Sequence, residues 1–551
     1  MDPRTRSWPA QPMLAALACT LVLLLAATAG SGTASADGTG LGSMKPGGKP
    51  ITGSQPFVSI LCKFKEKPDE PLSAAGMRTI FGVDGQGSTA NSAYPTVDRY
   101  WREVSYRTIF PSGGIDLNGS RVAGWVTLAG TESSYRKKDA GGNPIPVRDG
   151  FFEHDLERLR DDCIAAAEAQ VVNPDGTRGI NFNSFKGINL FFNGRLDGAS
   201  HGGTENLTLD NTRRDGIPLT WISLDGVKNQ DTIVHEMGHA FGLNHSSGPY
   251  LATYDSEWDT MSSGENCFPG SEFLQQGFGC IGHHTIAAHK AYLGWLPAAR
   301  RYDAKPGPAT TITLSRLAQP VQTAGVFWMA RLPIVGMADQ YYTVELRTGV
   351  GYDKGVPEGI VVHKVNELKS DRNAQVVDPD NNGSLGPSSR LLAGGVFTDD
   401  ALGISVRVES IDPAAGTARV TVGVTPLVKI DDVTVHEPAP APPPSNNPEP
   451  EPEPGQLFSP ARFTVRIPAP ATAPVTVSYA TAPGTASSGQ DYLHKTGTVT
   501  IPTGATSAAL TVDVSRDRFN EPAETFFVNL SNPVNGKLAD SQGKGTILDF
   551  D

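Results

Sequence analysis

The sequence predicts a multidomain protein in which an α/β domain is followed by a β-rich domain and a C-terminal β-sandwich. At 551 residues the chain is too long for a single hydrophobic core. Its 60 glycines and 43 prolines favour β-rich modules joined by turns and linkers over helical bundles. Strand and helix patterns alternate up to about residue 300, and short strand-like runs follow. These observations set the order of the three domains.

The N-terminus has the three regions of a secretory signal peptide. Two arginines precede an apolar run from Met13 to Ala27, and a small-residue Ala-Ser-Ala sequence ends at Ala36. A membrane anchor is the alternative, but the run is short for a span. We therefore expect a signal peptide at 1–36, a flexible Gly- and Ser-rich lead-in at 37–55, and a secreted, extracellular protein with no membrane anchor after cleavage.

Four cysteines remain once the signal peptide is removed, and an even count in an exported chain suggests two disulfides. The short separation of Cys267 and Cys280 favours that pair. Pairing of Cys62 with Cys163 then follows by elimination, with a buried free thiol at either position as the alternative.

The charge balance argues against a nucleic-acid partner. The formal net charge is -12, whereas phosphate binding requires clustered lysine and arginine. Acidic side chains are instead available for calcium, which prefers carboxylate oxygens.

The first domain, predicted at 56–300, has both strand and helix signals. Apolar strand patterns occur at 57–64, 121–128, 187–192 and 220–224, and helical patterns at 96–106 and 153–170. A mixed α/β layer structure follows from this alternation.

A metal-binding pattern lies near the end of this domain. His235 and His239 are four residues apart, so a helix places them on the same face, close enough to bind one ion. Gly242 allows the backbone to leave helical angles and bring His245 back toward that ion. Three imidazoles leave one coordination position open, which is typical of a catalytic zinc site. Glu236, beside the first ligand, is the candidate general base for hydrolysis by a zinc-activated water.

Five residues in register disfavour the alternative, a helix with core-facing histidines. The segment resembles the long metzincin motif, His-Glu-x-x-His-x-x-Gly-x-x-His. The stretches DRYWREVSY, HKAYLGW and YYTVELR are similar to immune-inhibitor-A-like and gametolysin-like peptidases. This resemblance implies an α/β metzincin catalytic domain, one catalytic zinc ion, and a secreted zinc metalloendopeptidase that hydrolyses protein or peptide substrates. It also implies that Met261 packs beneath the metal; the alternative is an ordinary core methionine.

The resemblance further implies that substrate binds as an added antiparallel strand along an edge of the sheet. The candidate edge comprises Trp221, Ile222, Ser223, Leu224 and Asp225, with an ordinary sheet strand as the alternative.

Short alternating runs predict a β-rich domain at 301–426. Residues 427–551 then resemble a Calx-beta domain, a β-sandwich here interrupted by a Pro-rich insertion at 438–455 that favours extended polyproline II. Its candidate calcium ligands are Glu437, Asp491, Asp517, Glu521, Glu524, Asp549 and Asp551. A spacer that binds no calcium is the alternative.

A second functional hypothesis therefore stays open beside the peptidase. The chain could be a calcium-dependent extracellular binding or adhesion protein whose peptidase domain is secondary or degenerate, with a matrix or cell-surface target bound through the C-terminal module. The intact Glu236 favours the peptidase, because a decayed site would most readily lose that residue.

Overall fold

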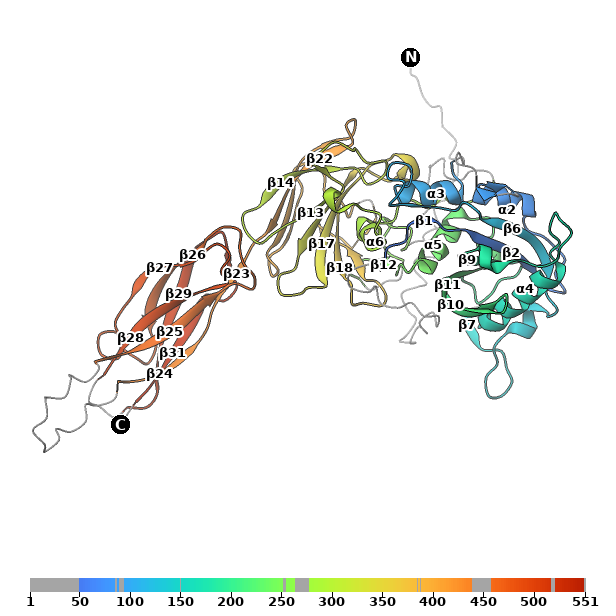
Figure 1. Cartoon of the computed structure of the whole chain (residues 1–551). Helices are drawn as coiled ribbons and strands as arrows, with labels where there is room; N and C mark the ends of the chain where they lie inside the picture. The colour runs from blue at the N-terminus through green and yellow to red at the C-terminus, as the bar shows by residue number, and fades with distance from the viewer. Residues whose placement is uncertain are drawn as a thin grey trace, which may run out of the picture. The chain divides into compact units, whose positions relative to one another are not determined.

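The computed structural model describes residues 49–84, 87–88, 94–148, 150–250, 254–262, 277–383, 385–386, 388–438, 457–516 and 521–549. The predicted signal peptide and most of the Pro-rich insertion therefore lie outside the described residues. Within them the protein is multidomain and strongly β-rich (Figure 1). None of the helices in this part of the chain is both long and apolar enough to cross a membrane.

A five-stranded mixed sheet organises the first region. Its order is β10 (His201–Leu209), β11 (Thr212–Ile222), β9 (Gly187–Phe192), β2 (Phe57–Lys63) and β6 (Arg121–Thr127). Neighbouring strands run parallel except β10, which is antiparallel to β11 and forms one edge of the sheet. The strands expected at 57–64, 121–128 and 187–192 are present, whereas β11 begins eight residues before the expected start at 220.

Both faces of this sheet are buried, because the side chains of β2 alternate between two cores. Phe57 and Leu61 join a core with α2 (Ala74–Phe81), α3 (Val97–Val104) and α5 (Gln230–Ala240). The intervening Val58 and Ile60 face the opposite core, which contains α4 (Leu156–Gln170). Figure 1 shows α2 and α3 on one side of the sheet and α4 on the other.

A disulfide between Cys62 and Cys163 joins β2 to α4, confirming the pair expected by elimination. Cys280 is also disulfide-bonded, but Cys267, its expected partner, lies outside the described residues.

The end of the predicted lead-in is ordered, which corrects the expectation of a flexible segment up to residue 55. β1 (Gly53–Ser54) pairs in parallel with β5 (Ile115–Asp116). The backbone of Ile51 donates to Leu293 O at 3.1 Å, and its carbonyl accepts from the indole of Trp295 at 2.8 Å. These backbone hydrogen bonds hold a sequence whose Gly-rich composition predicts no structure.

Smaller elements complete the first region. They are the pairs β3 (Val83–Asp84) with β4 (Gly87–Ser88) and β7 (Pro146–Arg148) with β8 (Phe151–Phe152), the helix α6 (Ala287–Tyr292), and the 3-10 turns η1 (Glu132–Tyr135), η2 (Phe182–Ser184), η3 (Leu224–Gly226) and η4 (Ala298–Arg300).

The second region contains two sheets with a buried core between them. The six-stranded sheet has the order β12 (Ser246–Ser247), β19 (Ala374–Val376), β18 (Gly359–Asn366), β17 (Gln340–Arg347), β16 (Met329–Pro333) and β13 (Arg301–Asp303). The five-stranded sheet has the order β15 (Val326–Phe327), β14 (Thr310–Ser315), β22 (Thr417–Val424), β21 (Ile404–Asp412) and β20 (Val396–Asp399), and η5 (Gly351–Asp353) follows β17.

This second region is continuous with the first. Strand β12 belongs to its six-stranded sheet although it directly follows His245, and Trp328, Met329 and Tyr352 lie in the same buried cluster as α3 and α5. The predicted boundary near residue 300 therefore does not separate two independent cores.

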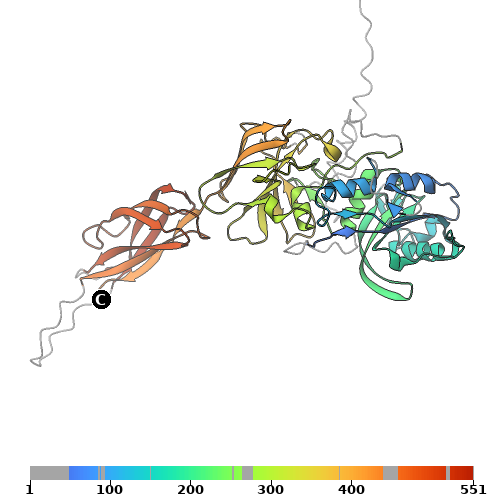
Figure 2. The same cartoon turned by 45° about the horizontal axis from the view of Figure 1, so that its top comes forward.

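The C-terminal region is a β-sandwich of two sheets around one core (Figure 2). One sheet has the order β28 (Ser507–Ser515), β25 (Phe458–Arg466), β23 (Leu427–Ile430) and β30 (Lys537–Leu538). The other has the order β24 (Val433–His436), β31 (Gln542–Leu548), β29 (Glu524–Val534), β26 (Val475–Pro483) and β27 (Thr496–Ile501). The first two strands of the sandwich, β23 and β24, lie in different sheets.

Candidate metal and calcium sites

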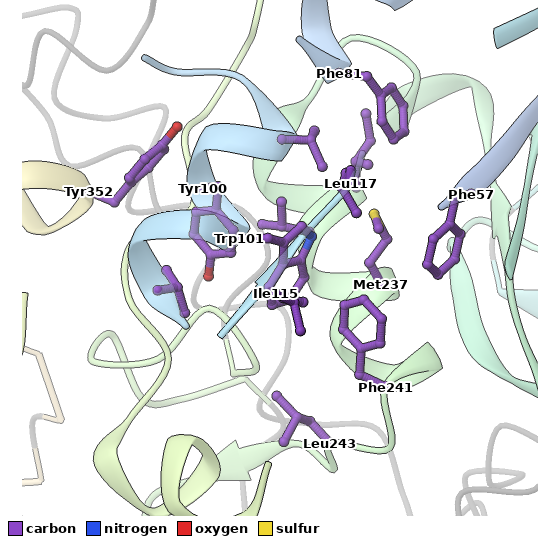
Figure 3. Close-up of a cluster of buried hydrophobic side chains, with 14 of the residues drawn as sticks. Phe57, Phe81, Tyr100, Trp101, Ile115, Leu117, Met237, Phe241, Leu243 and Tyr352 are labelled. Atoms are coloured by element: carbon purple, nitrogen blue, oxygen red, sulfur yellow. The ribbon is translucent and has the colours of Figure 1, made fainter. Parts of the chain in front are cut away.

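Helix α5 has two chemically different faces. Met237 and Phe241 point into the buried cluster shown in Figure 3, where the Phe241 ring lies 5.0 Å from that of Trp101. Because successive helical residues are separated by about 100°, His235 and His239 project from the other side of the helix. The apolar face therefore fixes the helix in the core, and the histidine face is left for the site.

Gly242 ends this helix. Its φ is +96°, a left-handed conformation that favours glycine, and its N–H donates to His239 O at 2.8 Å. The N–H of Leu243 donates to Gly238 O at 3.0 Å, which completes a Schellman termination. The turn reverses the chain so that His245 comes back beside the helix.

The three imidazoles converge on one point. His239 Nε2 lies 3.1 Å from His235 Nε2 and 3.0 Å from His245 Nε2. Three ligands about 2.0–2.1 Å from one tetrahedral zinc ion would be about 3.3 Å apart, so the spacing fits such an ion. Within the described residues, no fourth His, Cys, Asp or Glu joins this group.

The remaining ring nitrogens establish which atoms are available to a metal. Each Nδ1 faces an oxygen, namely Thr260 O at 2.6 Å from His235, Leu243 O at 2.8 Å from His239, and Asp371 Oδ1 at 3.1 Å from His245. Each Nδ1 therefore carries the proton and each Nε2 carries a lone pair. Three lone pairs this close repel one another unless a cation lies between them.

The protonation state also suits a metal ligand. Burial, together with repulsion from His245, lowers the pKa of His235 to about 4 and lowers the pKa of His239 well below its ordinary value. Both rings are neutral at pH 7, as metal coordination requires.

Met261 packs directly against the helix turn that carries the histidines. It is fully buried, and a Cβ placed on Gly238 would lie 2.3 Å from its Sδ. The preceding carbonyl, Thr260 O, accepts the proton of His235 Nδ1. Met261 and Thr260 thus pack beside the helix turn that carries His235 and His239.

Buried ion pairs hold the Met261 segment in place. Arg347 is fully buried, lies 2.7 Å from Asp353 and 3.1 Å from Glu345, and donates to Trp258 O at 2.6 Å. This arginine belongs to β17, so the second region supports the segment beneath the histidines. Opposite charges within hydrogen-bonding distance offset the desolvation of each group.

Two residues beside the histidines were missed by sequence reasoning. Asp371 follows β18 and lies 126 positions after the histidine it contacts, so no local pattern identifies it. The ring of Tyr254 lies 4.9 Å from that of His245 and 6.0 Å from that of His235. Its φ of 59° is uncommon for an aromatic residue, a signal visible only in the structure.

The predicted substrate edge at Trp221–Asp225 is wrong. Trp221 lies in β11 between β10 and β9, where it pairs with His201 and Leu190, and its side chain is fully buried. After Ile222 the chain leaves the sheet, with Ser223 preceding the 3-10 turn η3 that contains Leu224 and Asp225. The strand at this end of the sheet is the neighbouring β10.

In the C-terminal sandwich, three predicted calcium ligands come together. Oxygens of Asp491, Glu521 and Glu524 lie within 4.8 Å of one another. Asp549 is adjacent, since its Oδ2 accepts a hydrogen bond from the backbone of Glu521 at 2.7 Å. Glu437 is fixed by its backbone N–H, which donates to Leu548 O at 3.0 Å. Asp517 and Asp551 lie outside the described residues.

Comparison with known proteins identifies this C-terminal module. Residues 460–551 match the Calx-beta domain family, so the chain carries a Calx-beta domain at its C-terminus. The structure adds β23 and β24 to the same sandwich. No curated protein sequence matches the chain.

Several solved structures are similar. An apo-form Calx CBD1 domain is 25% identical over 23% of this chain and 99% of its own, with a TM-score of 0.18. CBD12 from CALX1.2 is 25% identical over 22% of this chain and 44% of its own, with a TM-score of 0.18. OgpA from Akkermansia muciniphila is 10% identical over 90% of this chain and 95% of its own, with a TM-score of 0.21. At these TM-scores the structural similarities carry no functional argument.

Proposed function

We propose that the protein is a secreted zinc-dependent endopeptidase. The observation that carries the proposal is the convergence of three imidazole Nε2 atoms: His239 Nε2 lies 3.1 Å from that of His235 and 3.0 Å from that of His245. A zinc ion held there would keep an open coordination position, lower the pKa of the water it binds and polarise a substrate carbonyl.

Glu236 supplies the acid and base chemistry in this proposal. It directly follows the first ligand on α5 and is largely buried, with 6% of its surface exposed. A carboxylate in this position can take a proton from the attacking water and deliver one to the leaving amine of the peptide. Its backbone is held against the sheet, because Gly202 of β10 leaves no room for a side chain beside Glu236 O.

The edge strand β10 is the substrate platform that we propose in place of Trp221–Asp225. It is the end strand of this sheet in the part of the chain that the structure describes. An extended peptide can add there through main-chain hydrogen bonds. The strand also passes beside Glu236 at Gly202, which would bring a peptide bound along it near the proposed base.

Casein cleavage tests the proposal. Wild-type protein should degrade casein, a zinc chelator should abolish the cleavage, and added zinc should restore it. Glu236→Ala should lose cleavage while it retains zinc, because the residue is a base and not a ligand. Absence of cleavage by correctly processed, zinc-loaded wild type would refute the proposed function.

The carboxylate cluster supports calcium binding as a second function of the chain. Asp491, Glu521 and Glu524 repel one another at their separation of less than 4.8 Å unless a cation or proton intervenes. Calcium prefers such hard oxygen ligands, and the Calx-beta match supports this choice of ion. We propose that this module binds calcium and contributes to contact with an extracellular surface or matrix target.

Calorimetric titration of the full chain with calcium tests this second proposal. Asp491→Asn should weaken binding at least tenfold because it removes one ligand charge, whereas Asp540→Asn, at an exposed position outside the cluster, should leave it unchanged. Wild-type protein that takes up no calcium would reduce the module to a spacer.

A further inference from the structure

The third histidine differs from the other two in its supporting partner. His235 and His239 place their Nδ1 atoms against backbone carbonyls from nearby loops. His245 instead places its Nδ1 3.1 Å from a carboxylate oxygen of Asp371, which the predicted domain boundaries assign to the β-rich region. A carboxylate partner fixes the tautomer of an imidazole and raises its basicity more than a neutral carbonyl does.

The loop that carries Asp371 is attached to the histidine segment on both sides of the contact. Before His245, Asn244 Nδ2 donates to Lys369 O at 3.4 Å. After it, β12 pairs in parallel with β19, with Ser246 opposite Ala374. The short strand pairing and the side-chain bond therefore constrain the position of the carboxylate relative to the ring.

A surface ion pair is the competing role for this carboxylate. Asp371 Oδ2 lies 3.5 Å from Arg372 Nε, and 48% of the Asp371 side chain is exposed. Exposed ion pairs contribute little to stability, so a role confined to that pair predicts almost no effect of substitution. The contact with His245 predicts an effect on metal affinity instead.

We propose that Asp371 is a positioning residue of the metal site, so that the β18–β19 loop of the β-rich region is an integral part of the centre. This inference rests on the proposed zinc site. It adds that all three proposed ligands come from the segment up to residue 300, whereas the side chain that supports the third ligand, His245, comes from beyond it. Asp371 does not touch the substrate in this account; it acts through the orientation and basicity of His245.

Zinc affinity, measured by competition with a chromogenic chelator, tests the proposal without relying on activity. The full chain is stripped of metal, and wild type is compared with Asp371→Asn and Asp371→Ala. We expect Asp371→Asn, which keeps a hydrogen-bond acceptor but loses the charge, to weaken zinc binding about tenfold. Asp371→Ala should weaken it about a hundredfold, as is usual when the carboxylate partner of a metal-binding histidine is lost.

Asp303→Asn is the matched control. Asp303 lies in the same region, has 49% of its side chain exposed and pairs with Arg301 at 2.9 Å, but has no contact with a histidine of the site. It should bind zinc like wild type. Because Asp371 is half exposed, its variants should also keep the wild-type urea midpoint.

A spectroscopic readout separates positioning from general loss of fold. The visible absorption bands of the cobalt-substituted protein should shift in Asp371→Ala and stay unchanged in Asp303→Asn, because those bands report ligand geometry. Equal zinc affinity and identical cobalt spectra in wild type and both Asp371 variants would overturn the inference. Wild type that binds no zinc would instead refute the proposed function itself.

Discussion

Replacing Gly202 by alanine should damage the site without removing any group that takes part in the chemistry. A Cβ at this position of β10 would lie 2.0 Å from Glu236 O, 2.7 Å from its carbonyl carbon and 3.0 Å from its Cα. Ordinary contact begins at 3.4 Å, so β10 and α5 must separate by roughly 1.4 Å. All three atoms are backbone, and no flexible side chain can move aside.

Two magnitudes follow from this displacement. Overpacking of this kind costs about 1–3 kcal/mol of unfolding free energy. A shift of about 1 Å in a catalytic group lowers turnover about a hundredfold, so kcat/KM should fall by about that factor. Zinc affinity should change less, because the strained contact is with the backbone of Glu236, which is not one of the proposed ligands.

The assay compares kcat/KM on a fluorogenic peptide, the urea midpoint and zinc affinity for wild type, Gly202→Ala and Gly349→Ala. Gly349 is the control because its Cβ would meet nothing closer than 3.5 Å. That variant should stay within about 1 kcal/mol of wild type and keep full activity. Wild-type kcat/KM and an unchanged midpoint in Gly202→Ala would refute the packing of β10 against Glu236.

Two further predictions concern stability. Burial, reinforced by the charge of Arg347, lowers the pKa of His283 to about 4, and burial lowers that of His363 to about 3. In the unfolded chain each of these histidines takes up a proton below about pH 6.5, whereas in the folded chain it stays neutral down to about pH 5. Acidification from pH 7 to 5 should therefore lower the unfolding free energy of the zinc-free protein by about 2 kcal/mol for each histidine. A urea midpoint that stays constant over this range would contradict the assignment. Substituting both Cys62 and Cys163 by alanine opens a link across 101 residues and should cost about 2–5 kcal/mol, measured by urea unfolding of both proteins without reductant. An unchanged midpoint would show that the bond does not constrain the chain.

Local spacing was sufficient to predict that the three histidines converge. His235 and His239 share a helix face because they are four residues apart, and Gly242 has the backbone freedom that the reversal to His245 requires. The nearly continuous apolar run at 57–64 likewise predicted a strand, and β2 is apolar throughout because its side chains meet two separate cores.

Features that depend on distant pairing were not predictable in this way. The substrate edge was misplaced to Trp221 because the strand pattern of β10 is weak: the strand contains two adjacent glycines and only two leucines. The sequence therefore did not reveal that β10 pairs with β11 and makes β11 an internal strand. Asp371 reaches the site through strand pairing between β12 and β19, which links segments more than a hundred residues apart. Periodicity also does not reveal which strands share a sheet, so it could not show that β12 joins the six-stranded sheet of the second region.

The central claim is that Glu236 performs the proton transfers at a zinc ion held by three histidines. The most direct test measures zinc content and peptide cleavage together in wild type and Glu236→Gln, which keeps the shape of the side chain and removes its basicity. We predict one zinc per chain in both proteins and a loss of at least a thousandfold in kcat for the variant, within the range of about 10²–10⁴ attributed to general acid and base catalysis. Cleavage by Glu236→Gln at the wild-type rate, or cleavage by wild-type protein that contains no zinc, would contradict the account.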